Sequence, residues 1–166
     1  MKRLFLALRV RLYDYDSLKF DFSNIIEGKW TRDENLHVTI CYFGDLYTKE
    51  EILDKMPLHV REIEPLSLSS IGFFSHNNIL YAKPQGYSTD ILHSSVCSLF
   101  VTKEKKAFIP HATLMRIKKI NDTKTFKDKM DKYENKEIGI IEPTLRLMQS
   151  RPQSGGVKYV CLKEFK

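Results

Sequence analysis

Two copies of the tripeptide His-x-Thr are the part of this chain best suited to acid–base chemistry. His37-Val38-Thr39 and His111-Ala112-Thr113 lie 74 positions apart, each within an apolar run typical of a β-strand. An imidazole with a pKa of about 6.5 can accept or donate a proton at neutral pH. A threonine hydroxyl can donate a hydrogen bond to an anionic oxygen. Two facing copies would supply the base, the acid and the anion contacts that cleavage of a phosphodiester requires, without a metal.

Side chains at positions i and i+2 of a strand project from the same face. Each histidine therefore shares a face with its own threonine, and the residue between them projects into the core. His93-Ser94-Ser95 is a near-match, but it lies in a segment with helical periodicity, where positions i and i+2 diverge. The two strand copies are therefore the candidate catalytic set.

The same alternation makes predictions for the neighbours of the two motifs. It places Phe43 on the face of His37 and Tyr42 on the opposite face, in the core. Cys41 falls on the His37 face, either as pocket lining or as core filler. Arg116 is an attractive phosphate clamp, although strict alternation turns it away from His111 unless a twist of the strand brings it round.

The elements that must position these residues also recur along the chain. Thr48 and Glu51 form a capping-box pattern at the start of one predicted helix, and Asp54-Lys55-Met56 recurs as Asp128-Lys129-Met130, again 74 residues later. Glu64-Pro65 and Glu142-Pro143 correspond with an offset of 78. The strands are predicted at about 4–10, 36–43, 66–74, 79–82, 111–116, from 143, and 157–162, and the helices at 16–27, 48–56, 88–101 and 122–132.

This order, β-α-β-α-β twice, predicts an α+β fold. We expect a bilobal, pseudo-twofold duplication in which antiparallel-rich sheets line a central cleft and helices lie outside. The whole chain, 1–166, is expected to be a single two-lobed domain with repeat halves of about 1–74 and 75–166.

Composition bounds the remaining possibilities. Hydrophobic residues make up 42% of the chain and charged residues 29%, and the net charge of +6 permits a polyanionic partner without requiring one. The N-terminal apolar run is too short for a signal peptide or a membrane span. Cys41, Cys97 and Cys161 include no CxxC pair, which favours reduced thiols in a cytoplasmic protein over a disulfide framework or a zinc site. A monomer is the default expectation.

Residues 36–44 (LHVTICYFG) and 110–116 (PHATLMR) resemble the two signatures of the two-histidine phosphoesterase superfamily. The match is best to RNA 2′,3′-cyclic phosphodiesterases of the LigT type, also called 2′-5′ RNA ligases, and residues 2–8, Trp30, 145–150, Gly156 and Tyr159 add to it. The resemblance implies hydrolysis of a ribose 2′,3′-cyclic phosphate to a 2′-phosphomonoester with no cofactor. It also implies that His111 activates water, that His37 protonates the departing 3′-oxygen, and that Thr39 and Thr113 bind the phosphate.

The expected partner is an RNA or nucleotide with a cyclic phosphate, and neither DNA nor a membrane is expected. RNA ends are commonly held by bases stacked on aromatic rings. Trp30, in a predicted loop, and Phe43 are the first candidates, followed by Phe5 and Tyr81. Two alternatives remain open: a 2′,5′-phosphodiesterase acting on 2′-5′ oligoadenylate, and an RNA-binding module without turnover. Two intact histidine motifs argue against the second, because binding alone would not need both imidazoles.

Overall fold

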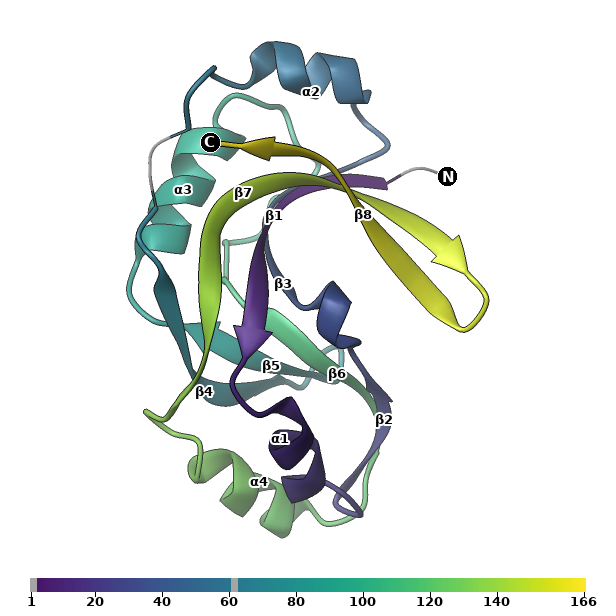
Figure 1. Cartoon of the computed structure of the whole chain (residues 1–166). Helices are drawn as coiled ribbons and strands as arrows, with labels where there is room; N and C mark the ends of the chain where they lie inside the picture. Colours follow the sequence, from purple (N-terminus) through teal and green to yellow (C-terminus); the bar gives the residue numbers. More distant parts are fainter. Residues whose placement is uncertain (1–2, 61–62) are drawn as a thin grey trace.

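The computed structural model describes residues 3–60 and 63–166, and Figure 1 shows how its strands and helices are arranged. The strands are β1 (Arg3–Leu12), β2 (Ile26–Trp30), β3 (His37–Gly44), β4 (Leu66–Phe74), β5 (Ile79–Pro84), β6 (Ala112–Ile120), β7 (Glu137–Gln153) and β8 (Gly156–Phe165). The helices are α1 (Tyr15–Asp21), α2 (Lys49–Lys55), α3 (Ser88–Cys97) and α4 (Thr123–Asp131), with a short 3₁₀ turn, η1 (Asp33–Asn35).

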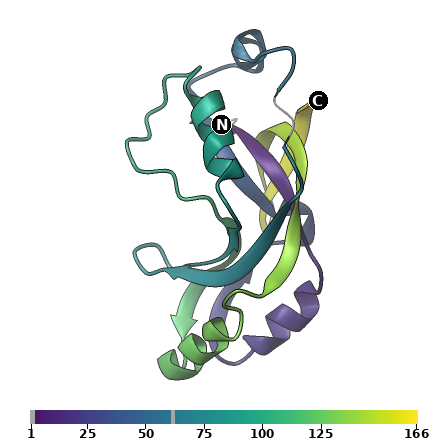
Figure 2. The same cartoon turned by 90° about the vertical axis from the view of Figure 1, so that its left-hand side faces the viewer.

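All the strands belong to one antiparallel sheet with the order β1-β3-β6-β5-β4-β7-β8, and β2 pairs with β6. Strand β7 is 17 residues long, curves around the molecule and pairs with both β4 and β1. The hydrogen-bonded path therefore returns to β1 and closes on itself. Helices α1 and α4 lie together at one end of the sheet, and α2 and α3 lie at the other (Figures 1 and 2). The α+β architecture predicted from the sequence is confirmed.

The strand register repeats with the offset seen in the sequence. Ala7 lies opposite Thr39 in the β1–β3 pair, and Tyr81 lies opposite Thr113 in the β5–β6 pair, 74 residues later in both strands. The helix caps repeat too. The Thr48 side chain accepts from the Glu51 backbone as part of the predicted capping box, and Asp122, again 74 residues on, caps α4.

The outer strands are exchanged between the two halves of the chain. Strand β1 pairs with β7 of the second half, and β5 of the second half pairs with β4 of the first. In these pairs Gly72 of β4 and Arg146 of β7 hold equivalent places, so the structural offset is again 74. The offset of 78 inferred from the Glu-Pro dipeptides is therefore wrong for the paired part of these strands.

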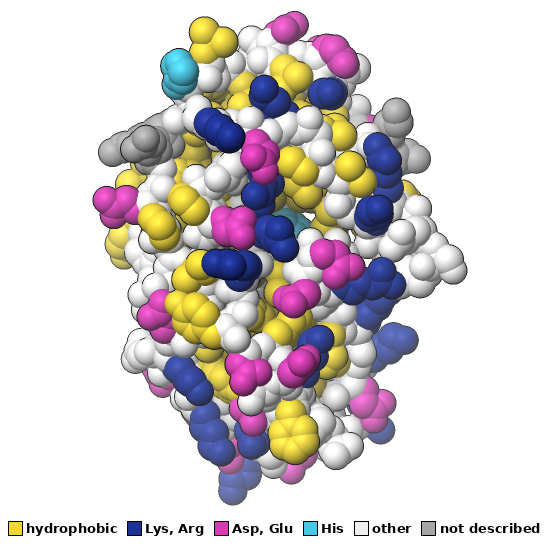
Figure 3. Space-filling model, viewed as in Figure 1, with side chains coloured by type: hydrophobic (Ala, Val, Ile, Leu, Met, Phe, Trp, Pro, Cys, Tyr) yellow, Lys and Arg dark blue, Asp and Glu magenta, His cyan; other side chains and the backbone are white. Residues whose placement is uncertain are grey.

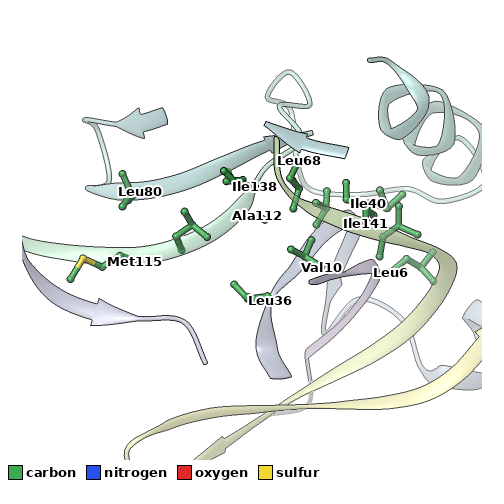
Figure 4. Close-up of a cluster of buried hydrophobic side chains, with 14 of the residues drawn as sticks. Leu6, Val10, Leu36, Ile40, Leu68, Leu80, Ala112, Met115, Ile138 and Ile141 are labelled. Carbon is green, nitrogen blue, oxygen red and sulfur yellow. The ribbon is translucent and has the colours of Figure 1, made fainter. Parts of the chain in front are cut away.

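The core draws side chains from both halves, as Figure 4 shows. Leu6 and Ile40 from the first half and Leu80 and Ile141 from the second are all buried in one cluster. Burying each such side chain contributes about 1.5–3 kcal/mol of transfer free energy, which holds the strands of the two halves against each other.

Two element boundaries differ from the prediction. The first helix stops at Asp21, and strand β2 occupies 26–30, where a helix and a loop were expected from the sequence. Gly28 belongs to this strand. It lies where β2 passes so close to β6 that a side chain would meet the backbone of Arg116. The local sequence could not show this contact, because the partner strand lies about ninety residues away.

The expectation of three reduced thiols is also wrong. Cys41 and Cys97 form a disulfide that joins β3 to α3, with Cα atoms 5.9 Å apart, and Cys161 is free and exposed. The two residues are 56 positions apart, so no short spacing motif predicted the disulfide. Among the described residues, no helix is long and apolar enough to cross a membrane.

Candidate active site

Strands β3 and β6 meet at a single residue pair, formed by Val38 of the first motif and Ala112 of the second. Both side chains are fully buried. Because the strands are antiparallel, each histidine lies beside the threonine of the other motif, on the face opposite this pair. All four polar residues line one cleft of about 400 Å³, here called the two-histidine cleft: His37, Thr39, His111 and Thr113.

A β-bulge in each strand brings one more side chain to this cleft. Ile40 has no partner between the Leu6–Cys41 and Ala7–Thr39 pairs, and Leu114 is skipped in the same way in the β5–β6 register. A bulge shifts the alternation by one residue. Tyr42 and Arg116, each five residues after a histidine, consequently line the two-histidine cleft. The expectation that Tyr42 lies in the core is wrong. The bulge at Leu114 turns Arg116 toward the cleft, as a twist of the strand was expected to do.

The same shift removes Phe43 from the cleft. Its side chain is 2% exposed and packs against Phe100, with ring centroids 4.6 Å apart. The prediction that Phe43 shares the face of His37 is therefore wrong, and its ring is unavailable to a base. Cys41 likewise is buried, in the disulfide with Cys97.

Both imidazole rings are oriented by the same backbone contact. The Nδ1 atom of His37 lies 2.7 Å from the carbonyl oxygen of Asn35, and that of His111 lies 2.8 Å from the carbonyl oxygen of Ile109. A carbonyl only accepts, so Nδ1 carries the hydrogen in each ring. The Nε2 atom is left to exchange a proton. In His37 it lies 3.1 Å from the Thr39 hydroxyl, which can donate to it.

The surroundings of His37 favour its neutral form in the free protein. Burial lowers the pKa of His37 below its ordinary 6.5, and a positive charge on His111 lowers it further. The hydrogen bond to the Asn35 carbonyl opposes both effects, because it stabilises the protonated ring. The charge on His111 acts on His37 because both rings line the two-histidine cleft.

Aromatic rings hold each imidazole from the side. Phe5 lies 5.2 Å and Tyr159 5.0 Å from the His37 ring centroid. Around His111, Phe74 lies 5.1 Å and Tyr81 5.9 Å away. Phe5 is only 3% exposed, so it supports the His37 ring more than it offers a stacking surface, although it lines the two-histidine cleft. Tyr81 stacks on Phe74 at 4.1 Å and contacts His111 from outside the residues that line the cleft.

Trp30 does not lie in the expected loop. It ends strand β2, and its half-buried ring packs against Tyr15 and Phe22, with centroids 6.0 and 6.4 Å away. It lines a smaller hollow beside the two-histidine cleft.

Several residues that line the cleft are not among the site candidates predicted from the sequence. Tyr159 reaches the cleft because the hairpin of β7 and β8 folds over it. Asn35 fastens this hairpin by donating from its side-chain amide to the Val157 carbonyl at 2.9 Å. Arg3 and Ser150 come from neighbouring strands that pair with each other. The family resemblance covered Tyr159 and the segments that contain Arg3 and Ser150, but no local pattern indicated that these residues reach the cleft, because hairpin closure is a long-range contact.

Comparisons with known proteins found relatives that match most of the chain. The chain is 28% identical to the RNA 2′,3′-cyclic phosphodiesterase of Methanocaldococcus jannaschii over 98% of this chain and 99% of the relative. It is 26% identical to the protein of the same name from Aquifex aeolicus, over 84% of this chain and 82% of the relative. No family model matches the chain.

Solved structures show the same fold. E. coli LigT complexed with 3′-AMP superposes with a TM-score of 0.72 at 17% identity, covering 99% of this chain and 97% of LigT. A Thermus thermophilus protein gives 0.71 at 18% identity, covering 98% and 96%. The paired His-x-Thr strands, the two relatives matched over most of their length and the shared fold make the chain similar to the LigT-type two-histidine phosphoesterases.

Proposed function

We propose that this protein hydrolyses ribose 2′,3′-cyclic phosphates, on RNA ends or nucleotides, to 2′-phosphomonoesters. The observation that carries the proposal is the pair of imidazoles whose Nδ1 atoms are both bound to backbone carbonyls, in one cleft with both threonines. The names of the Methanocaldococcus and Aquifex relatives support the same substrate class.

The proposed reaction uses one ring as base and the other as acid. The base takes a proton from water through Nε2, the water oxygen attacks phosphorus, and the bond from phosphorus to the 3′-oxygen breaks. The acid delivers its Nε2 proton to that oxygen, so the 3′-hydroxyl and the 2′-phosphate are the products. Thr39, Thr113 and Arg116 would hold the non-bridging oxygens, where negative charge must be stabilised.

We keep the assignment implied by the family, with His111 as base and His37 as acid. The low pKa of His37 supports it, because a more acidic imidazolium is a better proton donor to a leaving oxygen. An anionic substrate in the two-histidine cleft raises the pKa of a neighbouring imidazole, which allows His37 to take up the proton before it is needed.

We propose that the reaction needs no metal and no cofactor, because the two rings supply both proton transfers. Within residues 3–60 and 63–166, no group of three or more His, Cys, Asp and Glu side chains is arranged to hold a metal ion.

The proposal also includes a monomeric protein in the cytoplasm with RNA, not DNA, as its partner. Light scattering on the purified chain tests the monomer.

The direct test is a panel of substrates incubated with the protein in excess EDTA. We expect 2′-AMP from 2′,3′-cyclic AMP, and a terminal 2′-phosphate from an RNA that ends in a cyclic phosphate. Cleavage of 2′-5′ oligoadenylate alone would instead identify a 2′,5′-phosphodiesterase. RNA binding with no product from any substrate would leave a binding module, and activity that requires an added divalent cation would overturn the metal-free step.

A further inference from the structure

A second hollow of about 180 Å³ opens beside the two-histidine cleft, between the end of β2, η1 and the hairpin of β7 and β8. We call it the Lys29 pocket. Arg116, Tyr159 and Asn35 line both spaces, so a ligand can pass from one to the other along their side chains. Pockets that enclose a whole drug-sized ligand usually exceed about 300 Å³, so this one suits a part of a larger substrate.

The charge of the Lys29 pocket is of one sign. Lys29 and Arg32 line it together with Arg116, and no Asp or Glu is among the residues that do so. Both Lys29 and Arg32 are exposed, and in the described part of the chain no carboxylate lies within 4.0 Å of these three cations. In Figure 3, Lys and Arg side chains gather on the side of the molecule where β2 and β8 lie.

The other hollows that adjoin the two-histidine cleft differ in this respect. One, of about 280 Å³, contains Arg146, but this guanidinium is already paired with Glu142 and Glu164 at 3.2 and 3.0 Å. The other, of about 450 Å³, contains Asp45 and Glu104 beside its cations. In either of them a phosphate would meet carboxylates beside the cations, whereas the charged residues that line the Lys29 pocket are all cations.

The pocket also has fixed walls. The Lys29 ammonium donates to the Gly155 carbonyl at the tip of the hairpin, and Asn35 donates to Val157 farther along it. These two contacts join the hairpin to β2 and η1. An ammonium has three donors, so Lys29 keeps two for a ligand. The Trp30 ring, which forms another wall, offers an apolar surface to a ribose or a base.

We infer that the Lys29 pocket binds the phosphate on the 5′ side of the nucleoside whose cyclic phosphate lies between the two histidines. This inference rests on the proposed function and names the substrate class more closely: an RNA end, or a nucleotide with a 5′-phosphate, in preference to a cyclic nucleoside monophosphate. Lys29 and Arg32 supply the positive charge, and Arg116 remains with the cyclic phosphate.

The test compares three substrates that differ only on the 5′ side: 2′,3′-cyclic AMP, its 5′-phosphorylated form, and the dinucleotide ApA with a 2′,3′-cyclic phosphate. We expect kcat/KM to rise at least about 10-fold when the 5′-phosphate is added, the scale of one hydrogen bond to a charged group. The dinucleotide should share this gain. The gain should fall with added salt, because it depends on screened charges.

Variants at Lys29 and Arg32 test whether the preference for a 5′-phosphate arises in the Lys29 pocket. Lys29→Gln and Arg32→Gln should each remove most of the preference for the 5′-phosphate, expressed as the ratio of kcat/KM values for the two mononucleotides. Lys29→Arg should restore it, which separates loss of charge from loosening of the hairpin. Lys118→Gln, at an exposed lysine of β6 that lines none of these hollows, is the matched control and should leave the ratio unchanged.

Each result is decisive for one of the two proposals. Equal kcat/KM for all three substrates would overturn the Lys29 pocket while leaving the proposed function intact. The Lys29 pocket would also be overturned if Arg9→Gln, in the 280 Å³ hollow, removed the preference for the 5′-phosphate and the Lys29 variants did not. If no cyclic substrate is turned over, the proposed function is wrong. The pocket is then judged from the ratio of Kd values for the two mononucleotides, measured by calorimetry, and a ratio near one overturns it.

Discussion

Each imidazole of the two-histidine cleft is held in one tautomer by the backbone two residues before it. The Nδ1 hydrogen of His37 is bound by the Asn35 carbonyl, and that of His111 by the Ile109 carbonyl. Neither ring has to rotate or exchange tautomers before Nε2 acts. Such preorganised groups cost no rearrangement at the moment of reaction, which is where most electrostatic catalysis arises.

We expect His37→Ala and His111→Ala each to lower kcat by at least about 10²-fold, the usual contribution of a general acid or base. Steady-state rates on 2′,3′-cyclic AMP measure this. His59→Ala, at an exposed histidine that lines none of the hollows described above, is the control and should keep its rate. Full activity in either cleft variant would contradict the two-imidazole mechanism.

The pKa of His37 also predicts how stability depends on pH. In the unfolded chain this imidazole binds a proton as the pH falls through about 6.5, whereas in the folded protein burial delays binding to lower pH. The unfolded state then binds more protons, so the free energy of unfolding decreases below about pH 6.5. Urea unfolding at about pH 7.5 and 5.5 should show a smaller decrease for His37→Gln than for the wild type. An equal or larger decrease would contradict the lowered pKa.

At the scale of elements, two bulges decide which side chains reach the substrate. Ile40 and Leu114 are skipped in their ladders, and the residues two positions later turn into the two-histidine cleft. The paired bulges put a phenol, Tyr42, on one side and a guanidinium, Arg116, on the other. Arg116 gives one wall of the cleft a positive charge, and this wall continues into the Lys29 pocket, while Arg3 is a second cation that lines the cleft.

Arg116→Gln should lower kcat/KM on 2′,3′-cyclic AMP by about 10- to 100-fold, the range for losing a hydrogen bond between charged groups. The side chain is exposed and lies at a strand position whose backbone is unaffected, so stability should change little. Thermal unfolding checks that point. Lys118→Gln, two residues along the same strand, is the control. A loss no greater than in the control would mean that Arg116 does not contact the phosphate.

The disulfide between β3 and α3 is the second structural feature at the scale of elements. A cross-link that closes a loop of this length stabilises a protein by about 2–4 kcal/mol, mainly by restricting the unfolded chain. We expect a reducing agent to lower the free energy of unfolding of the wild type by that amount and to leave Cys97→Ala unaffected. Cys161→Ala should respond as the wild type does. Equal stability with and without reductant would show that the bond does not form in solution.

The elements were predictable where local signals sufficed. The capping box at Thr48 and the repeated caps and motifs come directly from residue types, and the strand from 66 to 74 was predicted with its observed bounds. The bulges were not predictable, because neither Ile40 nor Leu114 is a glycine or any other residue that marks an irregular strand. The bulge at Ile40 reverses the alternation of side chains in β3, which places Phe43 in the core and Tyr42 in the cleft. Strand β2 and the Cys41–Cys97 bond were missed because their partners are distant in sequence.

At the scale of the whole molecule, the two halves share their strands. Strand β1 adds to the second half through β7, and β4 of the first half adds to β5. Neither half can complete its own sheet, and Leu6, Ile40, Leu80 and Ile141 belong to one core. We therefore infer that the chain folds as a single domain, as its sequence suggested.

This arrangement predicts one cooperative unfolding transition. Trp30, the sole tryptophan, lies in the first half, whereas circular dichroism reports strands and helices of both. The midpoints measured by tryptophan fluorescence and by circular dichroism in urea should coincide. Separate midpoints would show that the halves unfold independently, contrary to the exchanged strands.

The exchange of outer strands has a further consequence. A polypeptide of half this length, with one motif, would need a symmetric homodimer to complete its sheet and to bring a second ring to the substrate. In that homodimer every substitution would appear twice, so the proton donor and the proton acceptor would stay identical. Tandem fusion removes this constraint. Here Tyr42 stands where the other copy has Arg116, an asymmetry that only covalently joined repeats can acquire one site at a time.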